Sequence, residues 1–220
     1  MADITRIANV QISLQTTGIN KKGFNTILVA GPHVYSLPRV STYTSASAML
    51  SDGFLDTDPL YLAVRDALSQ TPRPKNVKVG RRQVDVATIE IKTVSSNADY
   101  VLKILKKAAN NIVTLTYTYT SGAGATATTI ATGIAALITA DAANTPVTAV
   151  GTTGDLVLTN KVAGTAFAVV LPVSMAVKSA PTVATVAADL TAIDAEDNAW
   201  YGFGITSRVS ADIQAAAAWA

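Results

Sequence analysis

The sequence contains few side chains that could act as catalysts or metal ligands. His33 is the only histidine and cysteine is absent, so thiolate chemistry, disulfides and cysteine-bound zinc are excluded. A catalytic triad or a histidine-based metal site needs partners that a single histidine does not specify. His33 directly follows Gly31 and Pro32, and we interpret it as a turn residue.

Two groups of acidic residues could in principle bind a hard cation. Asp52, Asp56 and Asp58 lack the spacing of an EF-hand, which requires ligands at alternating positions and a distal glutamate. Roles in turns and helix caps explain these three residues better. The acidic residues within 194–197 are interpreted as a solvated helix end.

Nucleotide-binding motifs are incomplete. Gly202 and Gly204 match part of a dinucleotide-binding fingerprint whose third glycine is missing, and there is no P-loop lysine motif. We therefore predict that the protein is not an enzyme and that it uses no cofactor and no metal.

The composition indicates a largely neutral surface. Hydrophobic residues make up 49% of the chain and charged residues 15%, whereas soluble domains typically contain about 25% charged residues. Such a surface either suits contacts between subunits or reflects half-buried threonines in a β-rich domain. The net charge is +2, and basic residues form only short clusters such as Arg81–Arg82, which we expect to be solvated. This distribution argues against a nucleic-acid partner.

No membrane insertion is expected either. The longest apolar stretch, 166–177, is too short for a membrane helix. The first residues lack the continuous apolar segment of a signal peptide. We therefore expect a protein that is made in the cytoplasm.

Two separated parts of the sequence are predicted to form an α/β layer. The first part, 21–83, is expected to contain a strand, two helices and a strand, over 24–30, 44–50, 58–70 and 76–80. Asp58 is the expected N-cap of the second helix, and Pro59 its first residue. The second part, 185–220, is expected to contain a helix, a strand and a helix, over 185–196, 200–205 and from Ser210 onward. Because the last helix reaches Ala220 without a cap, we expect the natural protein to continue.

Between them, residues 84–184 are predicted to form an inserted α+β module rich in strands. Apolar spacing indicates a helix over 97–110, with Val101, Leu102 and Leu105 facing inward, and a second helix ending near Asn144. At least four strands are expected, over 84–94, 112–120, 147–150, 156–159 and 167–171.

The first residues, 1–20, are predicted to form an extended arm. Val10, Ile12 and Leu14 alternate with polar residues, which is typical of a strand. A polar, glycine-punctuated segment follows them. An isolated strand is not stable in water, so we predict that these three residues pair with a sheet of the same subunit or of a neighbouring one.

Three stretches together resemble the tail sheath proteins of contractile-tailed bacteriophages. They are 58–65 continuing into 69–74, then 77–82, and finally 190–193 through 198–202 to 213–219. The resemblance lies in their sequences, order and spacing across nearly the whole chain.

The resemblance implies a fold and a function. In sheath proteins an α/β core is interrupted by variable domains that project outward, and terminal arms add strands to sheets of neighbouring subunits. The assembled sheath surrounds a tail tube and contracts, which drives the tube through the host envelope. Applied to this chain, the resemblance implies an arm at 1–20, a core at 21–83 and 185–220, and an outward-facing module at 84–184.

The implied partners are other copies of the subunit, the tail tube protein and the baseplate, and the implied location is the virion tail. The family's C-terminal domain and arm would lie beyond Ala220. The alternative is a phage surface-binding or adhesin-like module, because the Thr-, Ala- and Gly-rich stretch 117–181 also fits a projecting β-rich domain.

Overall fold

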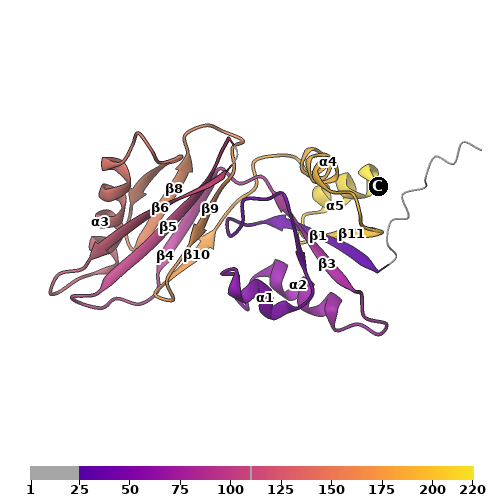
Figure 1. The fold of residues 1–220 in the computed structure, drawn as a ribbon, viewed down its shortest axis with the longest axis horizontal. Helices are drawn as coiled ribbons and strands as arrows, with labels where there is room; N and C mark the ends of the chain where they lie inside the picture. Colours follow the sequence, from indigo (N-terminus) through magenta and orange to yellow (C-terminus); the bar gives the residue numbers. More distant parts are fainter. Residues whose placement is uncertain (1–24, 110) are drawn as a thin grey trace, which may run out of the picture.

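A computed structural model describes residues 25–109 and 111–220 (Figure 1). About 36% of the structure is strand and 26% is helix, so the prediction of a mixed α/β chain is confirmed. The predicted arm strand at Val10, Ile12 and Leu14 lies outside the described residues.

The described chain contains five helices and eleven strands. The helices are α1 (Ala46–Ser51), α2 (Pro59–Leu68), α3 (Ala127–Ala140), α4 (Val186–Glu196) and α5 (Ser210–Trp219). The strands are β1 (Thr26–Pro32), β2 (Val40–Tyr43), β3 (Asn76–Arg82), β4 (Val86–Ile91), β5 (Asp99–Ala108), β6 (Asn111–Thr120), β7 (Val147–Gly151), β8 (Asp155–Asn160), β9 (Phe167–Val170), β10 (Met175–Ser179) and β11 (Gly202–Ile205).

Four strands form a mixed sheet with the order β11-β1-β3-β2, which we call the core sheet. β1 runs parallel to both β11 and β3, and β2 is antiparallel to β3. Leu28 and Ala30 pack in one cluster with side chains of α4 and α5, while Val29 packs in another with side chains of α1 and α2. Because side chains alternate along a strand, these clusters lie on opposite faces, and Figure 1 shows the two helix pairs on either side of the sheet.

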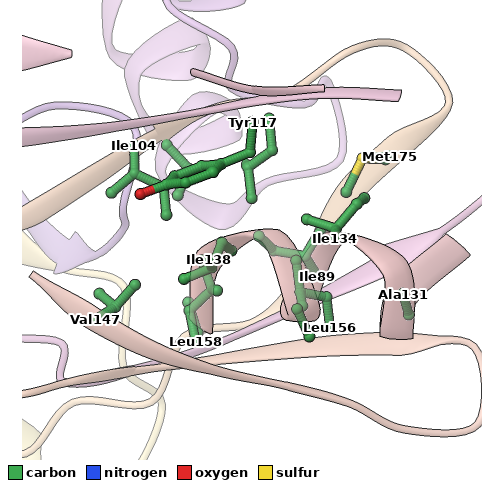
Figure 2. Close-up of a cluster of buried hydrophobic side chains, with 14 of the residues drawn as sticks. Ile89, Ile104, Tyr117, Ala131, Ile134, Ile138, Val147, Leu156, Leu158 and Met175 are labelled. Carbon is green, nitrogen blue, oxygen red and sulfur yellow. The ribbon is translucent and has the colours of Figure 1, made fainter. Parts of the chain in front are cut away.

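The segment 84–184, which we call the inserted segment, contains two antiparallel sheets and α3. Their strand orders are β10-β4-β8-β7 and β6-β5-β9. The helix contacts strands of both sheets, and Figure 2 shows Ile134 and Ile138 of α3 between Tyr117 and Leu158. These side chains belong to a buried hydrophobic cluster around α3. All but one of its buried residues belong to the inserted segment, and the exception is Val34.

Helix α3 begins and packs for local reasons. The Thr126 side chain accepts a hydrogen bond from Thr129 N at 3.1 Å, and the Thr129 hydroxyl accepts one from Thr126 N at 2.9 Å. This reciprocal arrangement satisfies donors that the helix leaves free at its start. Further along, a Cβ at Gly133 would overlap the Tyr119 ring, so glycine is what allows α3 to approach β6 this closely.

The inserted segment differs from its predicted content. Residues 97–110 were predicted to be helical, but they contain β5, which pairs with β6 over its full length and with β9. The described residues of the segment contain one helix where two were predicted, and their seven strands agree with the expectation of at least four. β10 and, outside the segment, β2 were not predicted.

Candidate functional site

The most distinctive polar feature is a buried group of charges at the end of β3. Arg81 and Arg82 were predicted to be solvated, but each is only 4% exposed. Asp189 of α4, 1% exposed, accepts from Arg82 Nε at 3.1 Å, from Arg39 Nη1 at 3.2 Å and from Gln83 N at 2.9 Å. The prediction was wrong for both arginines. Asp189 compensates the charge of Arg82, whereas Arg81 Nη2 donates to the carbonyl oxygen of Leu37 at 3.4 Å and burial lowers the pKa of Arg81 to about 10.

Arg82 links further elements to this group. Its Nη1 donates to Asp212 Oδ2 of α5 at 3.1 Å, and its Nη2 donates to the carbonyl oxygen of Ala184 at 3.2 Å. A hydrogen bond from Ser207 and the charge and hydrogen bond of Arg82 hold the pKa of Asp212 below its ordinary value. One side chain therefore joins β3, α4, α5 and the end of the inserted segment.

The acidic end of α4 also contacts the core sheet. Asp197 forms an ion pair with Lys78 of β3, and the Glu196 carboxylate accepts from Arg39 N at 2.9 Å and Val40 N at 3.2 Å. Glu196 is exposed, in agreement with the interpretation of residues 194–197 as a solvated helix end, whereas Asp197 is half-buried in its pair with Lys78. Both carboxylates hold α4 against the sheet.

The two chain segments that join the inserted segment to the core lie side by side. Val183 N donates to the carbonyl oxygen of Gln83 at 3.1 Å, and Val84 forms an isolated antiparallel bridge with Thr182. The chain thus leaves β3 and returns to α4 through one paired stem.

A second polar group lies just beyond this stem. Asp85 Oδ1 accepts from Gln83 Nε2 at 2.9 Å, from Asn160 Nδ2 at 2.9 Å and from Gly164 N at 3.0 Å. Partial burial raises the pKa of Asp85, but these hydrogen bonds outweigh it, and the pKa lies below the ordinary value. Asp85 fixes the start of β4 to the β8–β9 turn.

A small cavity of about 190 Å³ lies where β1 and β11 end, lined in part by His33, Tyr35, Asp58 and Thr206. His33 is 3% exposed, and burial, together with the charge of Arg81, lowers its pKa to about 3. Its Nδ1 accepts from Tyr35 N at 3.4 Å. The imidazole is therefore neutral at physiological pH and does not titrate near neutrality.

The three aspartates of the first acidic group have turn and cap positions. Asp52 ends α1 and accepts from the Tyr43 hydroxyl at 2.8 Å. Asp58 is the N-cap residue of α2, although its carboxylate accepts from Leu55 N at 2.8 Å rather than from the helix. No group of three or more His, Asp and Glu residues in the described part of the chain could hold a metal ion.

One feature of the sequence does indicate a buried charged group. Asp189 shares a helix face with Val186, Leu190 and Ile193, all of them buried. A carboxylate on an apolar helix face requires a buried cationic partner, but the sequence does not show which of its 17 basic residues that is. The pairing itself spans more than a hundred positions and could not be deduced.

Comparisons with known proteins leave the family open. The sequence matches no protein-family model, and no curated protein matches it. Among the described residues, no helix has both the length and the apolar character to cross a membrane.

Proposed function

We propose that the chain is a non-enzymatic structural subunit of a contractile tail sheath, which polymerises around a tail tube and contracts to drive the tube through the host envelope. The observation that carries this proposal is where the sheath-like stretches lie. They coincide with α2, β3, α4, the approach to β11, and α5. All of them belong to the core sheet and its helices, and none lies in the inserted segment.

The same division of the chain supports an α/β core with an inserted, outward-facing module. The inserted segment has its own buried cluster and is joined to the core by one paired stem, and it also contacts the core at Val34, whose carbonyl oxygen accepts from Val169 N at 2.7 Å. Arg82 and Asp189 connect that stem to α4 and α5. A force on the module would therefore pass to the core in part through these ion pairs and in part through the contact at Val34, which suits a subunit that must rotate as one body.

The proposed partners are further copies of the subunit, the tail tube protein and the baseplate. The arm strand at Val10, Ile12 and Leu14 would add to a sheet of a neighbouring subunit. Each backbone hydrogen bond contributes only about 1 kcal/mol. Many subunits donating one strand each would nevertheless hold the polymer strongly, because linked sites act together.

The test is assembly of the protein expressed from its complete reading frame. We expect tubes by electron microscopy, and we expect Ile12→Pro to abolish them because proline removes a strand donor. Ile12→Val, which keeps the donor and the strand propensity, should assemble normally. The melting temperature of the Pro variant should equal that of the wild type.

Two results would count against this proposal. A large fall in melting temperature with normal tubes would place the arm strand in its own subunit. Absence of tubes, combined with glycan or receptor binding by the inserted segment, would favour the adhesin-like alternative.

A further inference from the structure

The longest open sheet edge in the described residues belongs to β6. This strand has 10 residues and pairs with β5 on one side only, in a continuous register without a bulge. The other edge strands of the three sheets have four or five residues.

The edge lacks the features that usually prevent sheets from joining. Natural proteins protect open edges with charged residues, proline or bulges. β6 has the sequence NIVTLTYTYT, which contains no charge, no proline and no glycine. Isoleucine, valine, threonine and tyrosine also favour extended structure.

The hydrogen bond next to the end of β6 shows which of its backbone groups face the open edge. Ser121 N donates to the carbonyl oxygen of Ala98 at 2.9 Å, and this pair continues the register of β5 and β6. Residues of an antiparallel ladder alternate between bonded and non-bonded pairs. The odd-numbered residues of β6 therefore bond to β5, and the even-numbered ones present their N–H and C=O groups at the open edge. These are Ile112, Thr114, Thr116, Thr118 and Thr120, and all five are exposed.

We propose that β6 pairs antiparallel with β6 of a second copy of this chain, with Thr116 opposite Thr116. Opposed residues must both belong to the even-numbered set, so that their free groups meet and the two sheets keep a common face. Centring the pair on Thr116 places Thr114 opposite Thr118 and Ile112 opposite Thr120. The free N–H and C=O groups of all five even-numbered residues are then paired in each copy, which gives about ten hydrogen bonds. Any other centre leaves some of them unpaired.

Charge does not oppose this pairing. The nearest lysine on the outer face, Lys103, lies on β5 opposite Thr116. In the joined sheet it would be about 14 Å, three strand spacings, from its counterpart in the second copy. That is beyond the screening length of about 8 Å at physiological ionic strength.

The pair is closed, because each copy covers the edge of the other and neither edge remains available. The inference goes beyond the proposed function and does not rest on it, since a sheath subunit and an adhesin-like module would carry the same edge. Whether the complete protein forms tubes is a separate question with a separate assay.

Sedimentation equilibrium of the 220-residue chain tests the association. We expect a concentration-dependent dimer. Thr116→Pro removes an N–H that does not bond to β5, and Thr116→Lys places two like charges opposite each other; both should be monomeric where the wild type is dimeric. Thr116→Val keeps the edge and should dimerise. A monomeric wild type at all concentrations, or a dimeric Thr116→Lys, would overturn the proposal.

Disulfide trapping tests the register without background, because the chain has no cysteine. Thr116→Cys should form a covalent dimer on mild oxidation, since opposed Cα atoms at about 5.5 Å suit a disulfide. Thr114→Cys and Thr118→Cys should each form no covalent dimer alone and should cross-link when the two variants are mixed. Equal cross-linking of all three alone would refute the register. Loss of the dimer after removal of residues 1–24 would refute pairing between two β6 strands, because it would show that the edge of β6 binds the N-terminal arm.

Discussion

Replacing Asp189 by asparagine tests whether the buried charges hold the core together. The change leaves the shape of the site intact and removes the charge that compensates Arg82, whose side chain is 5% exposed. Breaking a buried pair in this way typically costs about 3–5 kcal/mol. Arg82 keeps Asp212, so we expect the lower end, about 3 kcal/mol. The bond to Arg39, whose side chain is 19% exposed, should add less than about 1 kcal/mol.

Urea unfolding followed by tryptophan fluorescence measures this loss. The two tryptophans, Trp200 and Trp219, stack at 6.0 Å in the core, so their emission reports on the part of the chain that Asp189 holds. With an m-value of about 2–3 kcal/mol/M, the midpoint should fall by about 1–1.5 M at unchanged slope. Asp66→Asn is the control, because its pair with Arg65 is exposed and should contribute almost nothing. Equal midpoints for Asp189→Asn and Asp66→Asn would refute the role given to the buried cluster.

Three further results are expected. Gly133→Ala should destabilise the inserted segment by about 1–3 kcal/mol, because its Cβ meets the Tyr119 ring, whereas Gly122→Ala meets nothing within 4 Å; thermal melting by circular dichroism compares them, and equal melting temperatures would contradict the packing argument. The lowered pKa of Asp85 means that its contribution to stability is present above the ordinary aspartate value of 3.8 and disappears as the pH falls through and below it. Asp85→Asn should therefore be less stable than the wild type at pH 6, and this difference should shrink on acidification to pH 3; a difference that stays constant would exclude the linkage. Residues 84–184 alone should give a folded, protease-resistant product, and a disordered circular dichroism spectrum would show that the boundaries are wrong.

Local signals predicted most of the elements around the core sheet. Pro59 at the start of α2 and the glycine- and proline-rich ends of β1 and β3 placed these elements within a few residues. β2 was missed because its sequence, VSTY, is short and lacks an apolar run. It is a strand because β3 offers it a partner along four residues.

The error at 97–110 has a physical cause. Val101, Leu102 and Leu105 fit helical spacing, while Tyr100, Leu102 and Ile104 fit the alternation of a strand. Both patterns are present in the same segment. The choice is made by pairing with β6 and β9, which bury Tyr100, Leu102 and Ile104, and such pairing is not visible locally.

The polar groups could be predicted only in part. The positions of Asp52 and Asp58 followed from turn and cap preferences. The burial of Arg81 and Arg82 did not, because arginines at the end of a strand are usually solvated. Only the folded chain brings Asp189 to Arg82.

The paired stem has a consequence for how this protein could vary among relatives. Because Gln83 and Val84 lie beside Thr182 and Val183, the two ends of the inserted segment are about one strand spacing apart. A short turn could join them directly, and so could any other polypeptide whose own ends are adjacent. At the stem the core fixes only the separation of the two ends, so insertions of different size could be accepted there while the charges behind it stay fixed, provided that they also cover Val34, which packs in the buried cluster of the present insertion.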